Sequence, residues 1–214
     1  MPRVTHVKSA RKDNPVCKKG ESYYWWKFRY GGKRYSLTRP RPSQLTQSAY
    51  YSTVRGLVEQ IDDANPTDWD ELEALRDEIR DELENLGQES QDSLDNMPDA
   101  LQYSPTGELL QERIDACENA QSELEGIEEF DEEEPDRDDF EGEEEECSDC
   151  GGRGYEDEEE PDEKCLNCSG NGVLIEDDGE DDYNQALSDW EDNCHTHIES
   201  AKGEMVDAVS NCEV

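Results

Sequence analysis

The sequence lacks long apolar runs, and only three of its 214 residues are histidines. No window of about 18 apolar residues occurs and no apolar stretch follows the charged N-terminus, so neither a membrane span nor a signal peptide is expected. A phosphate-binding loop, a nucleophile elbow and a histidine paired with a carboxylate at ligand spacing are also missing. These absences predict a cytoplasmic, non-enzymatic protein with no membrane contact and no small-molecule substrate.

Apolar residues are scarce and charged residues are abundant. Only 31% of the residues are hydrophobic, 37% are charged, and the formal net charge is -39. Such a chain buries too little apolar surface to offset the entropy of ordering all of it. We therefore expect small folded pieces joined by acidic linkers, in an α+β, mainly α fold. In a reducing cytoplasm, eight cysteines favour metal binding over a disulfide framework.

The charges are unevenly distributed along the chain. Residues 1–55 contain 13 Lys and Arg against two acidic residues, a net charge of +11, whereas the remaining residues sum to -50. This asymmetry separates a basic head, residues 1–65, from an acidic body. A basic surface attracts nucleic acid, and we expect residues 1–55 to bind it.

Residues 21–37 of the head, ESYYWWKFRYGGKRYSL, predict a β-hairpin with a two-residue Gly31-Gly32 turn of type I′. In that register Tyr30 faces Lys33, Trp26 faces Leu37 and Phe28 faces Tyr35. Bases and aromatic rings then alternate on the opposite side, which is typical of nucleic-acid contact. A small solvated sheet with no ligand is the alternative. The candidate nucleic-acid-binding residues, including two arginines just after the hairpin, are Tyr23, Trp25, Lys27, Arg29, Arg34, Arg39 and Arg41.

A helix is expected after the basic strip Arg39-Pro40-Arg41-Pro42. Between residues 44 and 64 the spacing of apolar residues is helical, with an expected stripe of Tyr51, Val54, Val58 and Ile61. A short sheet followed by one helix looks like the small arm-type DNA-binding domains of phage integrases. That resemblance implies DNA binding by the head.

Residues 66–130 predict an acidic helical hairpin, paired like a short coiled coil. Asn65 or Thr67 is expected to cap the first helix, and Cys117 is expected in the core. The expected apolar stripes are Trp69, Leu72, Leu75, Ile79, Leu83 and Leu86 in the first helix, and Leu110, Ile114, Cys117, Leu124 and Ile127 in the second. The carboxylate-covered faces predict a protein partner, and the alternative is an acidic mimic of DNA that inhibits a basic protein.

Two acidic linkers and a last helix complete the chain. Residues 131–146 and 176–182 are expected to stay extended because their carboxylates repel one another, and the run at 156–163 continues the pattern. Residues 183–214 predict an amphipathic helix that packs on the helical hairpin or on a partner. Cys194, His195 and His197 lie one and two residues apart on it, so they point to different faces and do not favour a metal site.

Residues 147–175 contain the pattern Cys-x-x-Cys-x-Gly-x-Gly twice. Two cysteines at this spacing can reach one ion, and two such pairs supply the tetrahedral ligand set that zinc prefers. The predicted ligands of one structural zinc ion are Cys147, Cys150, Cys165 and Cys168. Redox chemistry is disfavoured because the surrounding carboxylates raise thiol pKa values.

The repeated motif resembles the cysteine-rich zinc domain of DnaJ-type chaperones, in which four copies make two zinc sites and the domain helps to bind unfolded clients. The His-Pro-Asp triplet of a J domain is missing here. The resemblance implies one zinc site and, as a further alternative, a client-binding chaperone-like module. The chain as a whole also resembles small phage-encoded proteins. The function expected from the sequence is a zinc-containing interaction protein whose head binds nucleic acid and whose acidic helices bind a protein.

Overall fold

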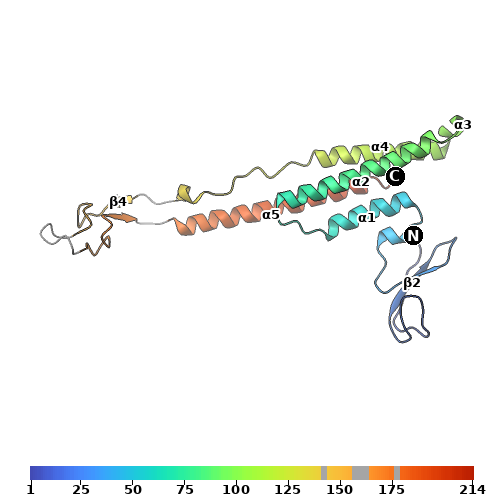
Figure 1. Ribbon diagram of the computed structural model, residues 1–214, viewed down its shortest axis with the longest axis horizontal. Coiled ribbons are helices and arrows are strands. Elements are labelled where there is room, and N and C mark those ends of the chain that lie inside the picture. The colour runs from blue at the N-terminus through green and yellow to red at the C-terminus, as the bar shows by residue number, and fades with distance from the viewer. Residues whose placement is uncertain (141–143, 156–163, 176–178) are drawn as a thin grey trace. The chain divides into compact units, whose positions relative to one another are not determined.

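A computed structural model describes residues 1–140, 144–155, 164–175 and 179–214. The predicted acidic run at 156–163 and parts of the two predicted linkers, 141–143 and 176–178, therefore lie outside the described residues. The chain forms two compact units, one of Met1–Glu129 with His197–Val214 and one of Phe130–Thr196. As predicted, the fold is α+β and mainly α, with a small antiparallel sheet (Figure 1). None of the helices in the described ranges has the length and apolar composition of a membrane span.

The first unit begins with a three-stranded antiparallel sheet. Its strands are β1 (Thr5–Val7), β2 (Tyr23–Lys27) and β3 (Lys33–Ser36), with β2 in the centre. Aromatic side chains fill β2, which suits a strand flanked on both sides. Trp26 and Phe28 are buried together with Ala10 and Cys17 from the connection between β1 and β2.

The predicted register of the hairpin is wrong. Trp26 pairs with Arg34, not with Leu37, and the strands end at the pair Lys27 and Lys33. The connection therefore spans residues 28–32 and is not a two-residue type I′ turn. The shift also moves Arg34 to the side of the sheet that carries Trp26, away from Trp25, because the side chains of directly paired residues share a side.

Helix α1 (Ala49–Asp63) follows the short 3-10 helix η1 (Pro42–Leu45). Ser48 caps α1 by accepting a hydrogen bond from the Tyr51 backbone N–H. The buried residues of α1 are Tyr50, Val54, Leu57 and Ile61. Tyr50 and Leu57 thus replace the predicted Tyr51 and Val58, because the buried face is rotated by one residue toward α2 and α4.

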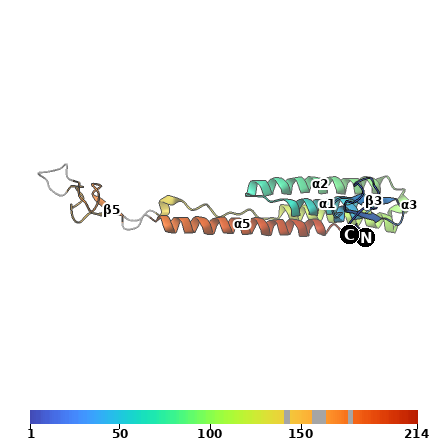
Figure 2. The same cartoon turned by 90° about the horizontal axis from the view of Figure 1, so that it is seen from below.

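Helices α2 (Trp69–Asp95) and α4 (Pro105–Glu125) form the predicted hairpin, connected through the short helix α3 (Asp99–Gln102) (Figure 2). Asp68 caps α2, not Asn65 or Thr67, since its side chain accepts from the Glu71 backbone N–H. Thr67 instead donates its own N–H to the Glu71 side chain. The seam is apolar and its buried residues include Leu72, Ile79, Leu83 and Leu86 from α2 and Ile114, Cys117, Ala120 and Leu124 from α4.

The C-terminal part of α5 (Glu180–Ser210) completes the core of the first unit. Lys202 Nζ donates to the backbone oxygen of Ala64, and Cys212 Sγ donates to that of Ala116, so this segment contacts both α1 and α4. The buried residues of this segment are Ile198, Ala201, Met205, Ala208, Val209 and Cys212. Residues 197–214 are therefore part of the first unit's core and not a detachable tail.

The second unit includes an acidic segment that is more structured than expected. Trp190 Nε1 donates a hydrogen bond of 2.9 Å to the backbone oxygen of Glu132, and the Trp190 ring lies 6.1 Å from that of Phe130. Phe140 ends the short 3-10 helix η2 (Arg137–Phe140), and its ring is 5.8 Å from that of Tyr183. Two phenylalanines thus hold residues 130–140 against α5. The predicted linker 176–182 is wrong at its end, because α5 begins at Glu180 and not after residue 182.

Replacing Leu83 with alanine should strongly destabilise the first unit. Leu83 is fully buried in the seam, and removing such a side chain costs about 2–5 kcal/mol. Urea denaturation followed by circular dichroism measures the change. Leu101→Ala, at a position that is 52% exposed in α3, is the matched control and should change the free energy of unfolding by less than about 0.5 kcal/mol. Equal effects of the two substitutions on the free energy of unfolding would contradict the burial of Leu83 between α2 and α4.

Candidate metal centre

Four cysteine side chains of the second unit converge on one point. Cys147, Cys150, Cys165 and Cys168 are all buried, and their Sγ atoms lie within 4.8 Å of one another. Two of the S···S distances are 3.9 Å, between Cys147 and Cys165, and 3.7 Å, between Cys150 and Cys168. A tetrahedron with zinc–sulfur bonds of about 2.3 Å has edges of about 3.8 Å. The structure therefore brings the four predicted ligands to positions that suit one metal ion.

Each motif folds into the same turn around its own cysteines. In the first motif Gly151 N–H donates to Cys147 O at 2.7 Å, and Gly154 N–H donates to Cys150 Sγ at 3.3 Å. In the second, Gly172 N–H donates to Cys168 Sγ at 3.2 Å. A backbone N–H aimed at a sulfur stabilises the thiolate that ligates metal.

The two motifs are also joined to each other by reciprocal hydrogen bonds. Cys147 N–H donates to Gly172 O at 3.0 Å, and Cys165 N–H donates to Gly154 O at 2.9 Å. The first cysteine of each motif thus binds the last glycine of the other. Both glycines have φ near +80°, and a Cβ at either would lie 2.5 Å or less from a backbone oxygen of the other motif. Only glycine fits where the motifs cross.

A short sheet and an isolated bridge extend the crossing. Strand β4 (Glu144–Glu146) pairs antiparallel with β5 (Val173–Ile175). Tyr155 pairs with Lys164 on the other side of the cysteines. Arg153 donates from Nε to Cys150 O at 2.8 Å, so a basic side chain lies beside one cysteine of the cluster.

The protonation of the cysteine cluster is uneven. Burial raises the pKa of Cys168, but N–H groups of Gly172 and Gly170 and the neighbouring thiols outweigh it and lower that pKa to about 7. Backbone N–H groups lower the pKa of Cys165, yet burial and the thiols of Cys168 and Cys147 raise it to about 11. Because metals bind thiolates, the affinity for a metal ion should fall as the pH is lowered.

The other metal-ligating side chains do not form a comparable group within the described ranges. His197, three residues after Cys194 in the sequence, uses Nε2 to contact the backbone oxygen of Glu128 at 2.9 Å. Cys117 is fully buried in the helical seam, as predicted, with its Sγ 3.7 Å from the Tyr50 hydroxyl. Hydrogen bonds from Cys212 and Tyr50 lower the pKa of the Cys117 thiol to about 7. No sequence pattern predicts this contact, because Tyr50 lies in α1, Cys117 in α4 and Cys212 just after α5, far apart along the chain.

The candidate nucleic-acid residues of the sheet lie partly on one side. Trp25 faces Tyr35 across the strands, and Lys33 Nζ lies 4.2 Å from the centre of the Trp25 ring. The Tyr23 ring is 6.0 Å from that of Tyr35, and Lys27 is exposed. Tyr23, Trp25 and Lys27 therefore share a side, but the Lys33 ammonium group covers one face of the Trp25 ring.

The four candidate arginines have different surroundings. The guanidinium group of Arg29 lies 5.3 Å from the Tyr30 ring, and that of Arg34 lies 5.3 Å from the Phe28 ring. Arg39 is exposed. Arg41 is exposed and paired with Asp63, whose hydrogen bond and charge raise the pKa of the arginine.

Comparison of the chain with protein-family models, with curated proteins and with solved structures finds no match. The resemblance of residues 147–175 to the DnaJ-type zinc domain rests on the two motifs and on the clustered thiols. It does not assign the chain to a family.

Replacing Cys165 with serine should abolish metal binding, because one of four ligands is lost. Elemental analysis of the intact protein should give close to one zinc per chain. Cys194→Ser, which removes a cysteine of α5 outside the cluster, is the matched control and should retain the metal. Chelation should unfold residues 147–175 and leave the helical content nearly unchanged, since folding and metal binding are coupled only there. Zinc retention by the Cys165→Ser variant would contradict the assignment.

Proposed function

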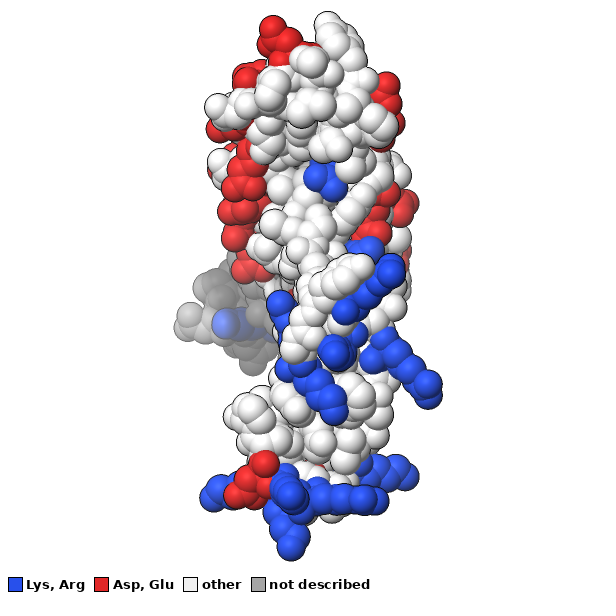
Figure 3. All heavy atoms as spheres, turned by 90° about the vertical axis from the view of Figure 1, so that its right-hand side faces the viewer, with Lys and Arg blue, Asp and Glu red and all other residues white. Residues whose placement is uncertain are grey.

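We propose that the chain is a non-enzymatic, zinc-binding interaction protein. The basic head binds nucleic acid and the acidic helices bind a protein partner. The observation that carries this proposal is the separation of charge within the first unit. Figure 3 shows Lys and Arg gathered over the end that contains the sheet, with a small group of Asp and Glu among them, whereas most Asp and Glu lie over the helical end. Two surfaces of opposite charge on one unit suit two different partners.

Zinc is the metal ion that the cysteine cluster suits best. Four thiolates are soft ligands, and the tetrahedral spacing of the sulfurs is the geometry of structural zinc sites. All four coordination positions are taken by protein, which leaves no position for a substrate or an activated water. The ion therefore serves to fold a segment in which the cysteines are the main buried side chains.

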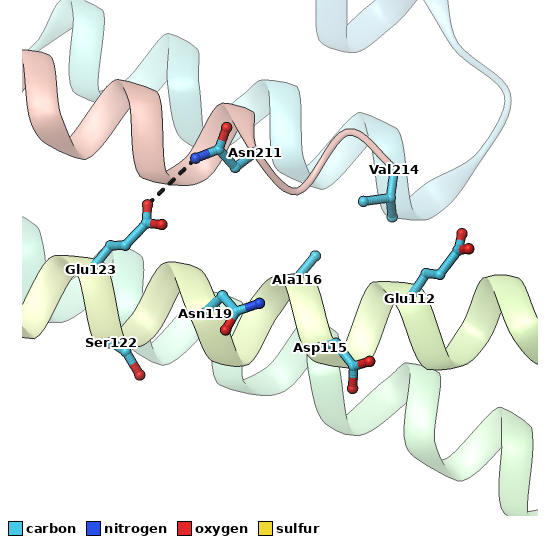
Figure 4. A pocket seen from close by; sticks show the side chains of 8 residues that line it. All are labelled: Glu112, Asp115, Ala116, Asn119, Ser122, Glu123, Asn211 and Val214. Atoms are coloured by element: carbon cyan, nitrogen blue, oxygen red, sulfur yellow. Dashed lines mark hydrogen bonds between the residues drawn. The ribbon is translucent and has the colours of Figure 1, made fainter.

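The proposed protein surface includes a hollow between α4 and the end of α5 (Figure 4). Its volume is about 560 Å³, and it is lined by Glu112, Asp115 and Glu123. Asn211 donates to Glu123 at 3.5 Å across it. The carboxylates favour a partner that inserts Lys or Arg side chains there.

Removing basic side chains from the head should lower the affinity for nucleic acid and reduce the dependence of that affinity on salt. Each phosphate contact contributes about 0.9 to the salt slope on a duplex and about 0.7 on a single strand. Fluorescence anisotropy at several salt concentrations measures the affinity and the salt slope. The variant combines Lys27→Gln, Arg29→Gln and Arg34→Gln. Arg76→Gln with Arg80→Gln, in α2, is the control and should leave the slope unchanged. An unaltered slope in the triple variant would favour a solvated sheet without a ligand.

Neutralising acidic residues should tighten nucleic-acid binding by the head. Acidic segments in the same chain have a millimolar effective concentration and compete with nucleic acid for the Lys and Arg side chains of the head. Because residues 197–214 belong to the core, the test replaces exposed acids and does not truncate the chain. Glu133→Gln, Glu134→Gln, Asp138→Asn and Asp139→Asn together should increase affinity at low salt, and the gain should shrink as salt screens the competition. Equal affinities at low salt would exclude self-competition.

A further inference from the structure

The connection between β2 and β3 presents an exposed aromatic ring near two basic side chains. Tyr30 is 74% exposed, one of the most exposed large apolar side chains of the described residues. Its backbone oxygen accepts a hydrogen bond of 3.0 Å from Gln47 Nε2, which ties the tip of the hairpin to the segment before α1. The ring is therefore held in solvent by a fixed backbone and does not pack into the core.

A hollow of about 360 Å³ adjoins this tip. Lys27 and Arg29 line it together with apolar side chains that include Phe28 and Leu45. Arg29 also lies 5.3 Å from the Tyr30 ring, and Gln47, which holds Tyr30, lines the hollow as well. The volume is within the range of about 300 to 1,000 Å³ that is typical of small-ligand sites.

The charges around the hollow favour a phosphate. None of the described residues that line it is acidic, and Asp13 and Glu21 form hydrogen bonds elsewhere. Asp13 accepts the Lys19 N–H and Glu21 accepts the Lys18 N–H, both in the connection between β1 and β2. Lys27 and Arg29 are therefore not neutralised by a carboxylate at the hollow.

Resting on the proposed function, the geometry points to the hairpin tip, residues 27–30, as a binding site for single-stranded nucleic acid. An unstacked base lies on the Tyr30 ring, and the adjoining phosphates lie at Lys27 and Arg29. A lone exposed ring can receive a base only if that base is outside a helix, because bases in a duplex are stacked on each other. Trp25, the ring expected from the sequence, is only partly exposed, and Lys33 lies closer to its ring centre, at 4.2 Å, than Arg29 lies to that of Tyr30, at 5.3 Å, so Trp25 is less suited to this role.

The test measures binding of the full-length protein to fluorescein-labelled oligothymidylate and to a duplex of equal length at the same salt concentration. The intact protein should favour the single strand. Tyr30→Ala should lower the affinity for oligothymidylate about fivefold or more, because stacking of one nucleobase on one ring contributes about 1–3 kcal/mol. Tyr30→Phe keeps the ring and should retain the affinity.

Tyr103→Ala is the matched control, since Tyr103 is 87% exposed at the end of α3 and far from the sheet in the sequence. It should bind like the intact protein. Tyr30→Ala should leave the salt slope unchanged, whereas Lys27→Gln and Arg29→Gln should each reduce it by about 0.7. Cross-linking with bromodeoxyuridine should label Tyr30.

Two outcomes separate the inference from the function on which it rests. If the intact protein binds neither nucleic acid, the proposed function fails and the inference fails with it. If it binds nucleic acid but Tyr30→Ala and Tyr103→Ala behave alike, or the duplex binds as tightly as the single strand, only the hairpin-tip site is overturned. Circular dichroism shows that the variants are folded.

Discussion

The carboxylates that follow residue 55 repel one another, and the helices depend on keeping them on the solvent side of a continuous apolar seam. Of the residues after position 55, 57 are Asp or Glu, yet the face between α2 and α4 is formed by leucine, isoleucine, alanine and cysteine. Apolar burial contributes about 25 cal/mol per Å², whereas exposed charges interact weakly in water. The seam therefore outweighs the repulsion as long as no carboxylate enters it.

The same constraint explains why the end of α5 returns to the first unit. Ile198, Met205 and Val209 would leave an apolar stripe in water if α5 stood alone, and the α1, α2 and α4 helices would expose a matching face. Packing the end of α5 against these helices buries both apolar surfaces. Arg55 strengthens this closure by pairing with Glu213, which lowers the pKa of the glutamate.

The cysteine segment, residues 147–175, is stabilised in its acidic surroundings by different interactions. Among the described side chains of this segment, the buried cluster consists of four cysteines, which offer little apolar surface to order it. The reciprocal bonds from Cys147 to Gly172 and from Cys165 to Gly154 set the crossing of the motifs, and a divalent cation bound by the four thiols would supply the remaining free energy. The surrounding carboxylates would also attract such a positive ion.

The convergence of the four cysteines and the helical hairpin could be predicted from the sequence, because both depend on local spacing. Two residues between cysteines, and apolar residues three and four apart, have the same geometric meaning in any fold. The predicted buried face of α1 was wrong by one residue at two positions. Tyr50 and Leu57 are buried because of contacts with helices that are distant in the sequence. The register of β2 and β3 was also decided by tertiary structure. Gln47 and the burial of Trp26 and Phe28 favour a five-residue connection over a local two-residue turn. That shift moves Arg34 to the Trp26 side and exposes Tyr30, because a strand pairing changes every side-chain neighbour when it slips.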